Sequence, residues 1–159
     1  MVADAGVRPG ELVLDLGAGR GALTAHLLAA GARVIAVELH AERARSLGER
    51  FGDRITVVRA DLSELRYPRR PYRVVASPPY GLSGAVLRSL LAPGSRLLAA
   101  DLVLQRAVVR RYLAGQAPGA GRWLRAFDLT AGRALPRAAF RPPPAVDSAV
   151  LIIRRRRAG

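Results

Sequence analysis

The sequence predicts an α/β fold with a doubly wound, mostly parallel sheet that carries an antiparallel hairpin at its C-terminal edge. Three observations lead to this prediction. Near-continuous apolar runs alternate with segments of helical spacing, which is typical of a parallel sheet covered on both faces. A glycine-rich turn separates the first apolar run from the first helical segment. The last two apolar runs are joined by too short a connection for a parallel crossover, so we expect them to pair antiparallel.

Strands and helices alternate regularly through the first two thirds of the chain. Apolar runs that end at glycine, proline or charged residues are predicted as strands, and segments with apolar residues every three or four positions as helices. The predicted strands cover 11–19, 33–39, 55–60, 72–77 and 96–105, and the predicted helices cover 21–31, 41–51, 82–91 and 106–113.

The last third departs from this alternation. Residues 114–123 are rich in glycine and are predicted to form a mobile loop. Strand-like runs follow at 127–135 and 148–155, and the connection 136–147 between them is stiffened by prolines. Nothing in the sequence indicates a second domain, so we expect residues 1–159 to form a single domain.

The charge of the chain favours a polyanionic partner. The 159 residues include 26 basic side chains, all arginine, against 12 acidic ones, which gives a formal net charge of +14. Phosphate contacts release counterions and supply affinity that does not depend on sequence, so nucleic acid is a better partner than a membrane surface. The absence of cysteine excludes disulfides, and two histidines make a metal site improbable. No long apolar run or signal peptide occurs, which predicts a cytoplasmic protein.

Glycines at the first turn predict a nucleotide site. Gly17, Gly19 and Gly21 lie between the first strand and the first helix, where glycine lets a backbone approach a ligand. Glu38 ends the second strand, where a carboxylate can accept both hydroxyls of a ribose. The alternatives are a tight turn without a ligand and a dinucleotide site, because the turn also satisfies the looser G-x-G-x-x-A pattern.

Two further features favour S-adenosylmethionine over a dinucleotide. Asp15 precedes the glycines and completes the spacing D-x-G-x-G-x-G, which is typical of S-adenosylmethionine sites. Asp61 ends the third strand, where its carboxylate can accept from an adenine amino group, unless it caps a helix instead. Leu39 and Leu62 are then expected to pack on the two faces of the adenine.

The fourth strand ends in a rigid corner, Ser77-Pro78-Pro79-Tyr80. An exocyclic amine on a base is a poor nucleophile because its lone pair is delocalised into the ring. The Pro78 carbonyl and the Ser77 hydroxyl can accept from its two N–H bonds and turn the lone pair toward a methyl donor, with little reorganisation. Tyr80 can stack on a flipped-out base. The alternative is a kinked strand end with a packed tyrosine.

At this point the chain resembles a known family, the Erm-type adenine-N6 methyltransferases of 23S rRNA, which are related to the small-subunit rRNA adenine dimethyltransferases. The resemblance is carried by VLDLGAGRGALTAHLLAAGARVIAVELH, VVRADLSELRYPRRPYRVVASPPYG, LAADLVLQRA and LPRAAFRPPPAVDSAVLIIRRR. It implies a Rossmann-like class I S-adenosylmethionine methyltransferase sheet and methylation of one adenine in 23S rRNA. It also implies resistance to macrolides, lincosamides and streptogramin B. The segment with Phe140 looks like the family's F-x-P-x-P-x-V-D-S pattern, which implies Phe140 as a second aromatic wall for the adenine.

The chain departs from this family in three places. Ser77 stands where the family's motif has asparagine, and it offers one oxygen on a shorter arm. Only MVADAGVRPG precedes the first strand, where members carry an N-terminal helical stretch. The C-terminal helical domain of typical members is also absent, as in short, mycobacterial-type members. The resemblance therefore implies a single catalytic domain at residues 1–159 that holds RNA by itself.

Arginines outside these motifs are the candidate phosphate contacts, because guanidinium groups bind phosphate through paired donors. Any one of them can equally be a solvated surface group, and Trp123 can stack on a base or pack on the domain. His26 and His40 are assigned no chemical role, no metal is expected, and we expect a monomer. The candidate RNA-binding residues are Arg69, Arg70, Arg106, Arg110 and Arg111, with Arg154 to Arg157 at the end of the chain.

Three alternatives remain open beside methylation of rRNA adenine. The first is methylation of another planar amine, such as DNA adenine or a protein glutamine, at the same proline corner. The second is a catalytically silent RNA-binding domain. The third is an NAD-dependent oxidoreductase, which leaves the Ser77–Tyr80 corner without a purpose. The charge and the Phe140 segment favour RNA.

Overall fold

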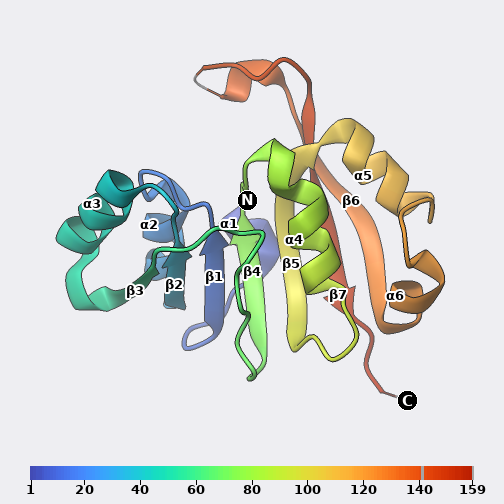
Figure 1. Ribbon diagram of the computed structural model, residues 1–159, viewed down its shortest axis with the longest axis horizontal. Coiled ribbons are helices and arrows are strands. Elements are labelled where there is room, and N and C mark those ends of the chain that lie inside the picture. The colour runs from blue at the N-terminus through green and yellow to red at the C-terminus, as the bar shows by residue number, and fades with distance from the viewer. Residues whose placement is uncertain (141, 159) are drawn as a thin grey trace.

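A seven-stranded mixed sheet forms the centre of the molecule, with the order β3-β2-β1-β4-β5-β7-β6 (Figure 1). In this computed structural model, residues 1–140 and 142–158 are described. The first five strands are parallel, and β7 runs antiparallel to both β5 and β6. The strands are β1 (Leu12–Leu16), β2 (Arg33–Val37), β3 (Ile55–Val58), β4 (Tyr72–Ala76), β5 (Leu97–Gln105), β6 (Phe127–Leu135) and β7 (Ser148–Arg155).

Helices cover the sheet in two layers. One apolar core lies between one face of the sheet and the helices α1, α2 and α3. The other lies between the opposite face and the helices α4, α5 and α6. This division confirms the predicted doubly wound α/β arrangement. The helices are α1 (Val2–Ala5), α2 (Ala22–Ala29), α3 (Ala41–Phe51), α4 (Ser83–Leu90), α5 (Arg106–Leu113) and α6 (Ala120–Ala126).

Helix α3 shows how the sequence pattern produces this packing. Its buried residues are Ala44, Leu47 and Phe51, which are three and four positions apart and therefore lie on one face. The remaining positions are mostly charged and face solvent. The strands β1 and β4, in the middle of the sheet, are instead apolar at almost every position because both of their faces are covered.

The C-terminal third confirms one prediction and corrects another. β6 and β7 form the predicted antiparallel hairpin, but β7 lies between β5 and β6, so the last strand of the chain is not at the edge of the sheet. The prediction of a loop over residues 114–123 is wrong in part, because α6 begins at Ala120. Trp123, on the buried face of α6, stacks on Tyr112 of α5 with ring centroids 5.7 Å apart. This aromatic contact holds the short helix against the domain.

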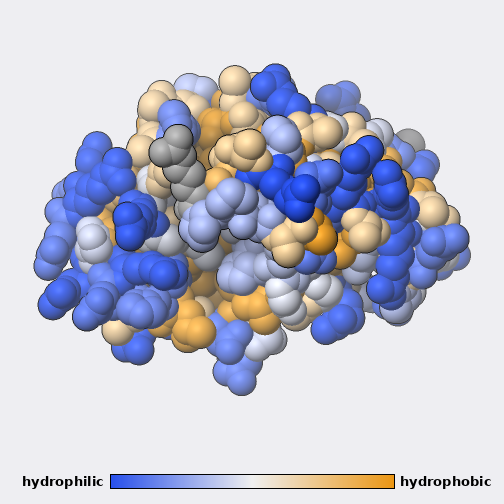
Figure 2. All heavy atoms as spheres, turned by 90° about the horizontal axis from the view of Figure 1, so that it is seen from above, coloured by the Kyte–Doolittle hydropathy of each residue, from blue (hydrophilic) through white to orange (hydrophobic). Residues whose placement is uncertain are grey.

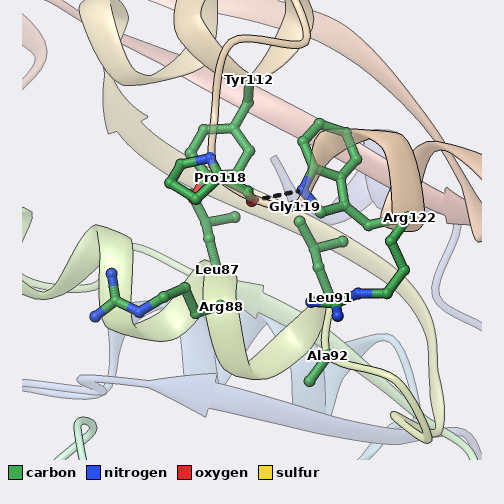
Figure 3. Close-up of a pocket in the computed structure, with 9 residues that line it drawn as sticks. Leu87, Arg88, Leu91, Ala92, Tyr112, Pro118, Gly119 and Arg122 are labelled. Carbon is green, nitrogen blue, oxygen red and sulfur yellow. Dashed lines mark hydrogen bonds between the residues drawn. The ribbon is translucent and has the colours of Figure 1, made fainter.

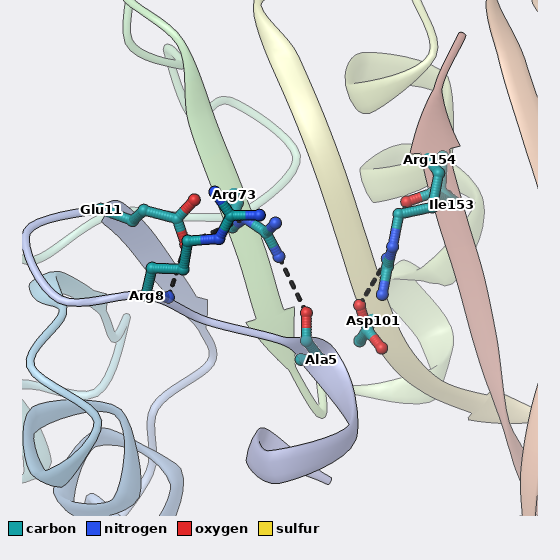
Figure 4. A network of polar contacts seen from close by, with 7 residues as sticks. All are labelled: Ala5, Arg8, Glu11, Arg73, Asp101, Ile153 and Arg154. Carbon is teal, nitrogen blue, oxygen red and sulfur yellow. Dashed lines mark hydrogen bonds and ion pairs between the residues drawn. The ribbon is translucent and has the colours of Figure 1, made fainter.

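Two arginine networks hold the face of the sheet that carries α1 (Figure 4). Arg73 of β4 donates to the carbonyl oxygen of Ala5 at 2.8 Å and pairs with Glu11 at 3.2 Å, which ties the N-terminal segment to the central strand. On β5, Asp101 is 2 % exposed and pairs with Arg154 of β7 at 2.6 Å. No helix among residues 1–140 and 142–158 is long and apolar enough to cross a membrane.

Candidate active site

Two turns meet at the carboxyl ends of β1 and β4. These strands are parallel neighbours, so the glycine turn after β1 and the proline corner after β4 lie side by side. Gly17 adopts φ +75°, and a Cβ atom there would lie 3.1 Å from Cδ of Pro79 and 3.6 Å from Cα of Pro78. Only glycine allows both this backbone conformation and this close approach. Gly17 therefore brings the predicted cofactor turn into contact with the predicted catalytic corner.

A cavity of about 240 Å³ lies where the two turns meet. It is lined by six of the predicted cofactor residues, which follow the carboxyl ends of four strands, β1 to β4. It is also lined by five residues that were not among the predicted cofactor contacts: Pro79 belongs to the predicted proline corner, and no local motif distinguishes the other four. The predicted residues that line it are Gly17, Gly19, Glu38, Leu39, Leu62 and Ser77, and the additional ones are Val37, Arg43, Ala60, Pro79 and Leu82.

Glu38 presents its carboxylate at the floor of this cavity. One of its oxygens accepts from the backbone N–H of Gly19 at 2.9 Å, and the other accepts from the N–H of His40 at 2.8 Å. Each carboxylate oxygen can accept a second hydrogen bond, so both remain able to bind the hydroxyls of a ribose. Leu62 is buried beside it, whereas Leu39 is 55 % exposed at the rim.

Gly19 and Gly21 serve the turn in different ways. Gly19 has φ +58° and turns its N–H toward Glu38, so it shapes the cavity directly. Gly21 has φ +90° and lies under α3, where a Cβ atom would come within 2.7 Å of the Phe51 ring and 2.8 Å of Leu47. Gly21 is thus required for packing of the turn on α3, and a direct contact between Gly21 and a cofactor stays a prediction.

Asp15 supports the turn from beneath. It is 1 % exposed, and its carboxylate accepts from the Thr24 hydroxyl at 2.8 Å. Burial raises the pKa of Asp15 from its ordinary value of 3.8 to about 6, the bonds from Thr24 oppose this shift, and the charge of Glu38 adds to it. Asp15 does not line the cavity, so its predicted contact with the cofactor remains a prediction.

The raised pKa of Asp15 predicts a pH-dependent stability. The folded state binds the proton of the Asp15 carboxyl group more tightly than the unfolded chain does. The contribution of Asp15 to the free energy of unfolding is therefore most favourable below pH 4 and is lost as the pH rises through about 6. In urea unfolding at pH 7.5, Asp15→Asn is expected to raise the free energy of unfolding by up to about 3 kcal/mol, because the amide carries no charge and keeps an oxygen acceptor for Thr24. This gain should shrink at pH 4.5, and a gain of the same size at both pH values would contradict the assignment.

Asp61 is engaged by its own turn. One of its carboxylate oxygens accepts from the backbone N–H of Ser63 at 2.9 Å and from its hydroxyl at 2.7 Å. These two bonds lower the pKa of Asp61. The capping alternative is therefore closest to the structure, although Asp61 begins a turn and not a helix. Asp61 does not line the cavity, and its binding to adenine stays a prediction.

The proline corner leaves Ser77 exposed in the cavity and Pro78 buried behind it. Tyr80 follows as the first residue of a short 3-10 helix, Tyr80–Leu82, which is closed by a bond from the N–H of Leu82 to the carbonyl oxygen of Pro79. The hydroxyl of Tyr80 is hydrogen-bonded to the Ser148 hydroxyl at the start of β7. Ser148 thus fixes the ring of Tyr80 beside the corner, a role that the sequence analysis missed.

Phe140 lies in the connection between β6 and β7. Figure 1 shows this connection projecting beyond the strand ends on the side of the proline corner. Arg137 holds its two arms together through Asp147 at 3.7 Å and the carbonyl oxygen of Ala145 at 3.2 Å. Phe140 is half-buried and does not line the cavity, so its role as a second aromatic wall stays a prediction.

The candidate RNA contacts fall at two ends of the sheet. Arg106, Arg110 and Arg111 are exposed on α5, which starts at the carboxyl end of β5 and so at the end that carries the cavity. Figure 2 looks down on that end and shows hydrophilic side chains gathered on its two flanks, with more apolar surface between them. Arg69 and Arg70 are also exposed, but they precede β4 and lie at its opposite, amino end.

The terminal arginines correct an expectation of RNA binding. Arg154 is held by the buried Asp101, and Arg156 pairs with Asp128 at 2.9 Å. Arg155 donates to the carbonyl oxygens of Leu97 and Ser95, each at 2.6 Å, and lies over the Phe127 ring. The interpretation of Arg154–Arg157 as free phosphate contacts is therefore wrong for Arg154 and Arg155, which bind the domain itself, whereas Arg156 lies in an exposed ion pair.

Trp123 also binds the domain. Its indole nitrogen donates to the carbonyl oxygen of Pro118 at 3.2 Å, and its ring stacks on Tyr112. Figure 3 shows Tyr112 and Pro118 in the pocket between α4, α5 and α6, which Trp123 also lines. The packed alternative for Trp123 is therefore correct. Among the described residues, no group of three or more histidine and acidic side chains could hold a metal ion, and His26 and His40 are exposed and do not line the cavity.

Known proteins similar to this chain include a ribosomal RNA methyltransferase and an antibiotic-resistance protein. Ribosomal RNA small subunit methyltransferase A of Anaeromyxobacter dehalogenans is 39 % identical over 91 % of this chain and 57 % of its own length. The mycinamicin-resistance protein MyrB of Micromonospora griseorubida is 36 % identical over 92 % of this chain and 47 % of its own. The chain thus spans about half the length of these curated relatives.

Solved structures agree on the fold. The 23S rRNA methyltransferase ErmE has a TM-score of 0.88 at 29 % identity, over 97 % of this chain and 65 % of its own. A dimethyladenosine transferase from Plasmodium falciparum has a TM-score of 0.83 at 23 % identity, over 98 % of this chain and 59 % of its own, which supports the fold alone. These likenesses confirm the predicted methyltransferase sheet. The model of the ribosomal RNA adenine dimethylase family matches residues 1–158, and the chain therefore belongs to that family.

Proposed function

We propose that this chain transfers a methyl group from S-adenosylmethionine to the exocyclic N6 amine of an adenine in 23S rRNA. The observation that carries the proposal is the shared cavity. The glycine turn and Glu38 form one side of it, and Ser77 and Pro79 form the other. A ligand held by the first group is thus presented to the corner that can bind an amine.

S-adenosylmethionine is the cofactor of the ribosomal RNA adenine dimethylase family, which confirms the cofactor predicted from the sequence. The residues of the cavity fit this molecule. Glu38 can accept from the ribose hydroxyls, the Leu62 side chain provides an apolar wall for an adenine, and Arg43 lies at the rim. When bound, the cofactor supplies an electrophilic methyl group on a sulfonium, so no metal or strong general base is needed.

The proposed catalytic role of the corner is to bind the amine in a reactive shape. The Ser77 hydroxyl and the Pro78 carbonyl would accept from its two N–H bonds, which favours a pyramidal nitrogen with an accessible lone pair. The two prolines keep these acceptors in place before the substrate arrives. Tyr80, fixed through Ser148, would stack on the flipped-out adenine. Phe140 would approach the same base from the β6–β7 connection.

The choice of 23S rRNA is supported by the likeness to ErmE, and resistance to macrolide-type antibiotics would follow from it. The second candidate is an adenine in 16S rRNA, which the 39 % identity to small-subunit methyltransferases favours. For both targets, the exposed arginines of α5 would bind the phosphate backbone near the corner. Membership in a methyltransferase family leaves the oxidoreductase alternative without support.

One experiment separates these possibilities. Purified protein is incubated with S-adenosylmethionine labelled in its methyl group and with protein-free 23S or 16S rRNA, and the modified position is mapped by primer extension. Label on one adenine of 23S rRNA is expected. Label on 16S rRNA alone would favour the second candidate. In parallel reactions with DNA or a glutamine-containing protein in place of the rRNA, label would favour another planar amine. RNA binding without any transfer would overturn the proposal and leave a silent RNA-binding domain.

A further inference from the structure

A second pocket with several hydrogen-bond donors lies at the amino end of β4, opposite the candidate active site. It has a volume of about 270 Å³ and is formed by the segment before β4, the start of β4 and the turn between α4 and β5. No acidic side chain is among the described residues that line it. Its polar lining consists of Tyr67, Arg69, Tyr72, Ser89, Ser95 and Arg96.

Two buried hydroxyls in this pocket lack a well-aligned hydrogen bond. The rings of Tyr67 and Tyr72 are stacked with their centroids 5.8 Å apart, and neither hydroxyl makes a well-aligned hydrogen bond among the described residues, although the Ser95 side chain is close enough to oppose the rise in the pKa of Tyr72. Tyr72 is 1 % exposed. Burial raises the pKa of both phenols, so both remain protonated at neutral pH and can donate. Buried donors without well-aligned partners are rare in native proteins, so these two hydroxyls are the unsatisfied donors of the pocket lining.

The walls of the pocket are fixed before any ligand binds. Arg155 of β7 donates to the carbonyl oxygen of Ser95 at 2.6 Å and holds the α4–β5 turn against the sheet. Gly94 gives this turn its shape with φ +80°, and the N–H of Ser95 closes it on the carbonyl oxygen of Ala92 at 3.1 Å. Arg69 and Arg96 both line the pocket and are exposed to solvent. A rigid, donor-rich and positively charged pocket is complementary to a compact anion with several acceptor oxygens.

We propose that this pocket binds a phosphate group of the RNA backbone and so holds the substrate at a second point. This inference rests on the proposed function. β4 has five residues and rises roughly 3.3 Å per residue, so its two ends lie about 17 Å apart, which one folded RNA segment can span. The connection from β3 to β4 reaches both sites, because Leu62 lines the cofactor cavity and Tyr67 lines the second pocket.

The test is the salt dependence of RNA binding. A fluorescein-labelled RNA hairpin with unpaired adenines in its loop is titrated with the full chain at several salt concentrations, and binding is followed by anisotropy. Arg69→Gln combined with Arg96→Gln is expected to make the slope of log affinity against log salt about one unit shallower, and to weaken binding about tenfold at 0.1 M salt. Tyr67→Phe, which keeps the stacked ring, should lower the RNA affinity by a smaller factor at every salt concentration.

The controls separate this site from general charge and from the methyltransferase activity. Arg122→Gln combined with Arg125→Gln removes two exposed charges from α6 and should leave the slope unchanged. S-adenosylmethionine affinity and thermal unfolding of all variants should match the wild type, because the cofactor cavity is at the other end of the sheet. RNA binding by Arg69→Gln/Arg96→Gln equal to that of the wild type would overturn the proposal. So would an equal loss in the α6 variant, or binding of inorganic phosphate alone without an effect on RNA.

Discussion

Tyr80→Ala is expected to lower the rate of methyl transfer by roughly 5- to 150-fold, because stacking of a base on an aromatic ring contributes about 1–3 kcal/mol. The cofactor cavity is lined by other residues, so affinity for S-adenosylmethionine should stay close to that of the wild type. Single-turnover transfer to rRNA measures the first quantity, and isothermal titration measures the second. An equal loss of both would show that Tyr80 serves only to shape the domain.

Tyr80→Phe is the matched control for this prediction. It keeps the ring and removes only the hydroxyl that is hydrogen-bonded to Ser148. If stacking is the main contribution of Tyr80, the phenylalanine variant retains most of the transfer rate. A loss as large as that of Tyr80→Ala would instead assign the effect to the bond with Ser148.

The second large effect is expected in the sheet, where Arg154→Met leaves the carboxylate of Asp101 buried without its partner. Breaking a buried pair in this way costs about 3–5 kcal/mol, which urea unfolding would measure as a loss in the free energy of unfolding. Asp101→Leu combined with Arg154→Met should recover most of that loss, because no charge then remains buried. If the free energy of unfolding of Arg154→Met alone were within about 1 kcal/mol of the wild-type value, water would have to reach Asp101 in the folded protein.

The parts of the fold that depend on local pattern could be predicted from the sequence. The alternation of apolar runs and helical spacing located β1 to β5 and their helices, and Gly17 and Glu38 marked the cavity because short motifs encode the ends of strands. The insertion of β7 between β5 and β6 was not predicted, because neighbouring strands in a sheet can be distant in sequence. A short connection indicates that two strands are antiparallel, but not what lies on their other sides.

Charged residues were the least predictable part of the site. The sequence indicated that Arg154 and Arg155 belong to a basic end of the chain that is free to bind phosphate. In the structure, Arg154 forms an ion pair with Asp101 of β5, and Arg155 donates to backbone carbonyl oxygens at the α4–β5 turn. The motif that contains Asp15 did not indicate its burial or its hydrogen bond from Thr24, and its contact with the cofactor stays a prediction. Ser148 stood in a recognised segment, but its bond to Tyr80 depends on tertiary packing.

A crystal structure with S-adenosylhomocysteine and adenosine monophosphate would show whether the proline corner binds the target amine. We expect the ribose hydroxyls to bind Glu38 and the sulfur to lie beside Ser77. The adenine amine should then donate to the Pro78 carbonyl and the Ser77 hydroxyl while its ring lies on Tyr80. A sulfur atom that faces away from the Ser77–Tyr80 corner, or an amine bound elsewhere with that corner filled by the protein's own side chains, would contradict the proposed catalytic role of the corner.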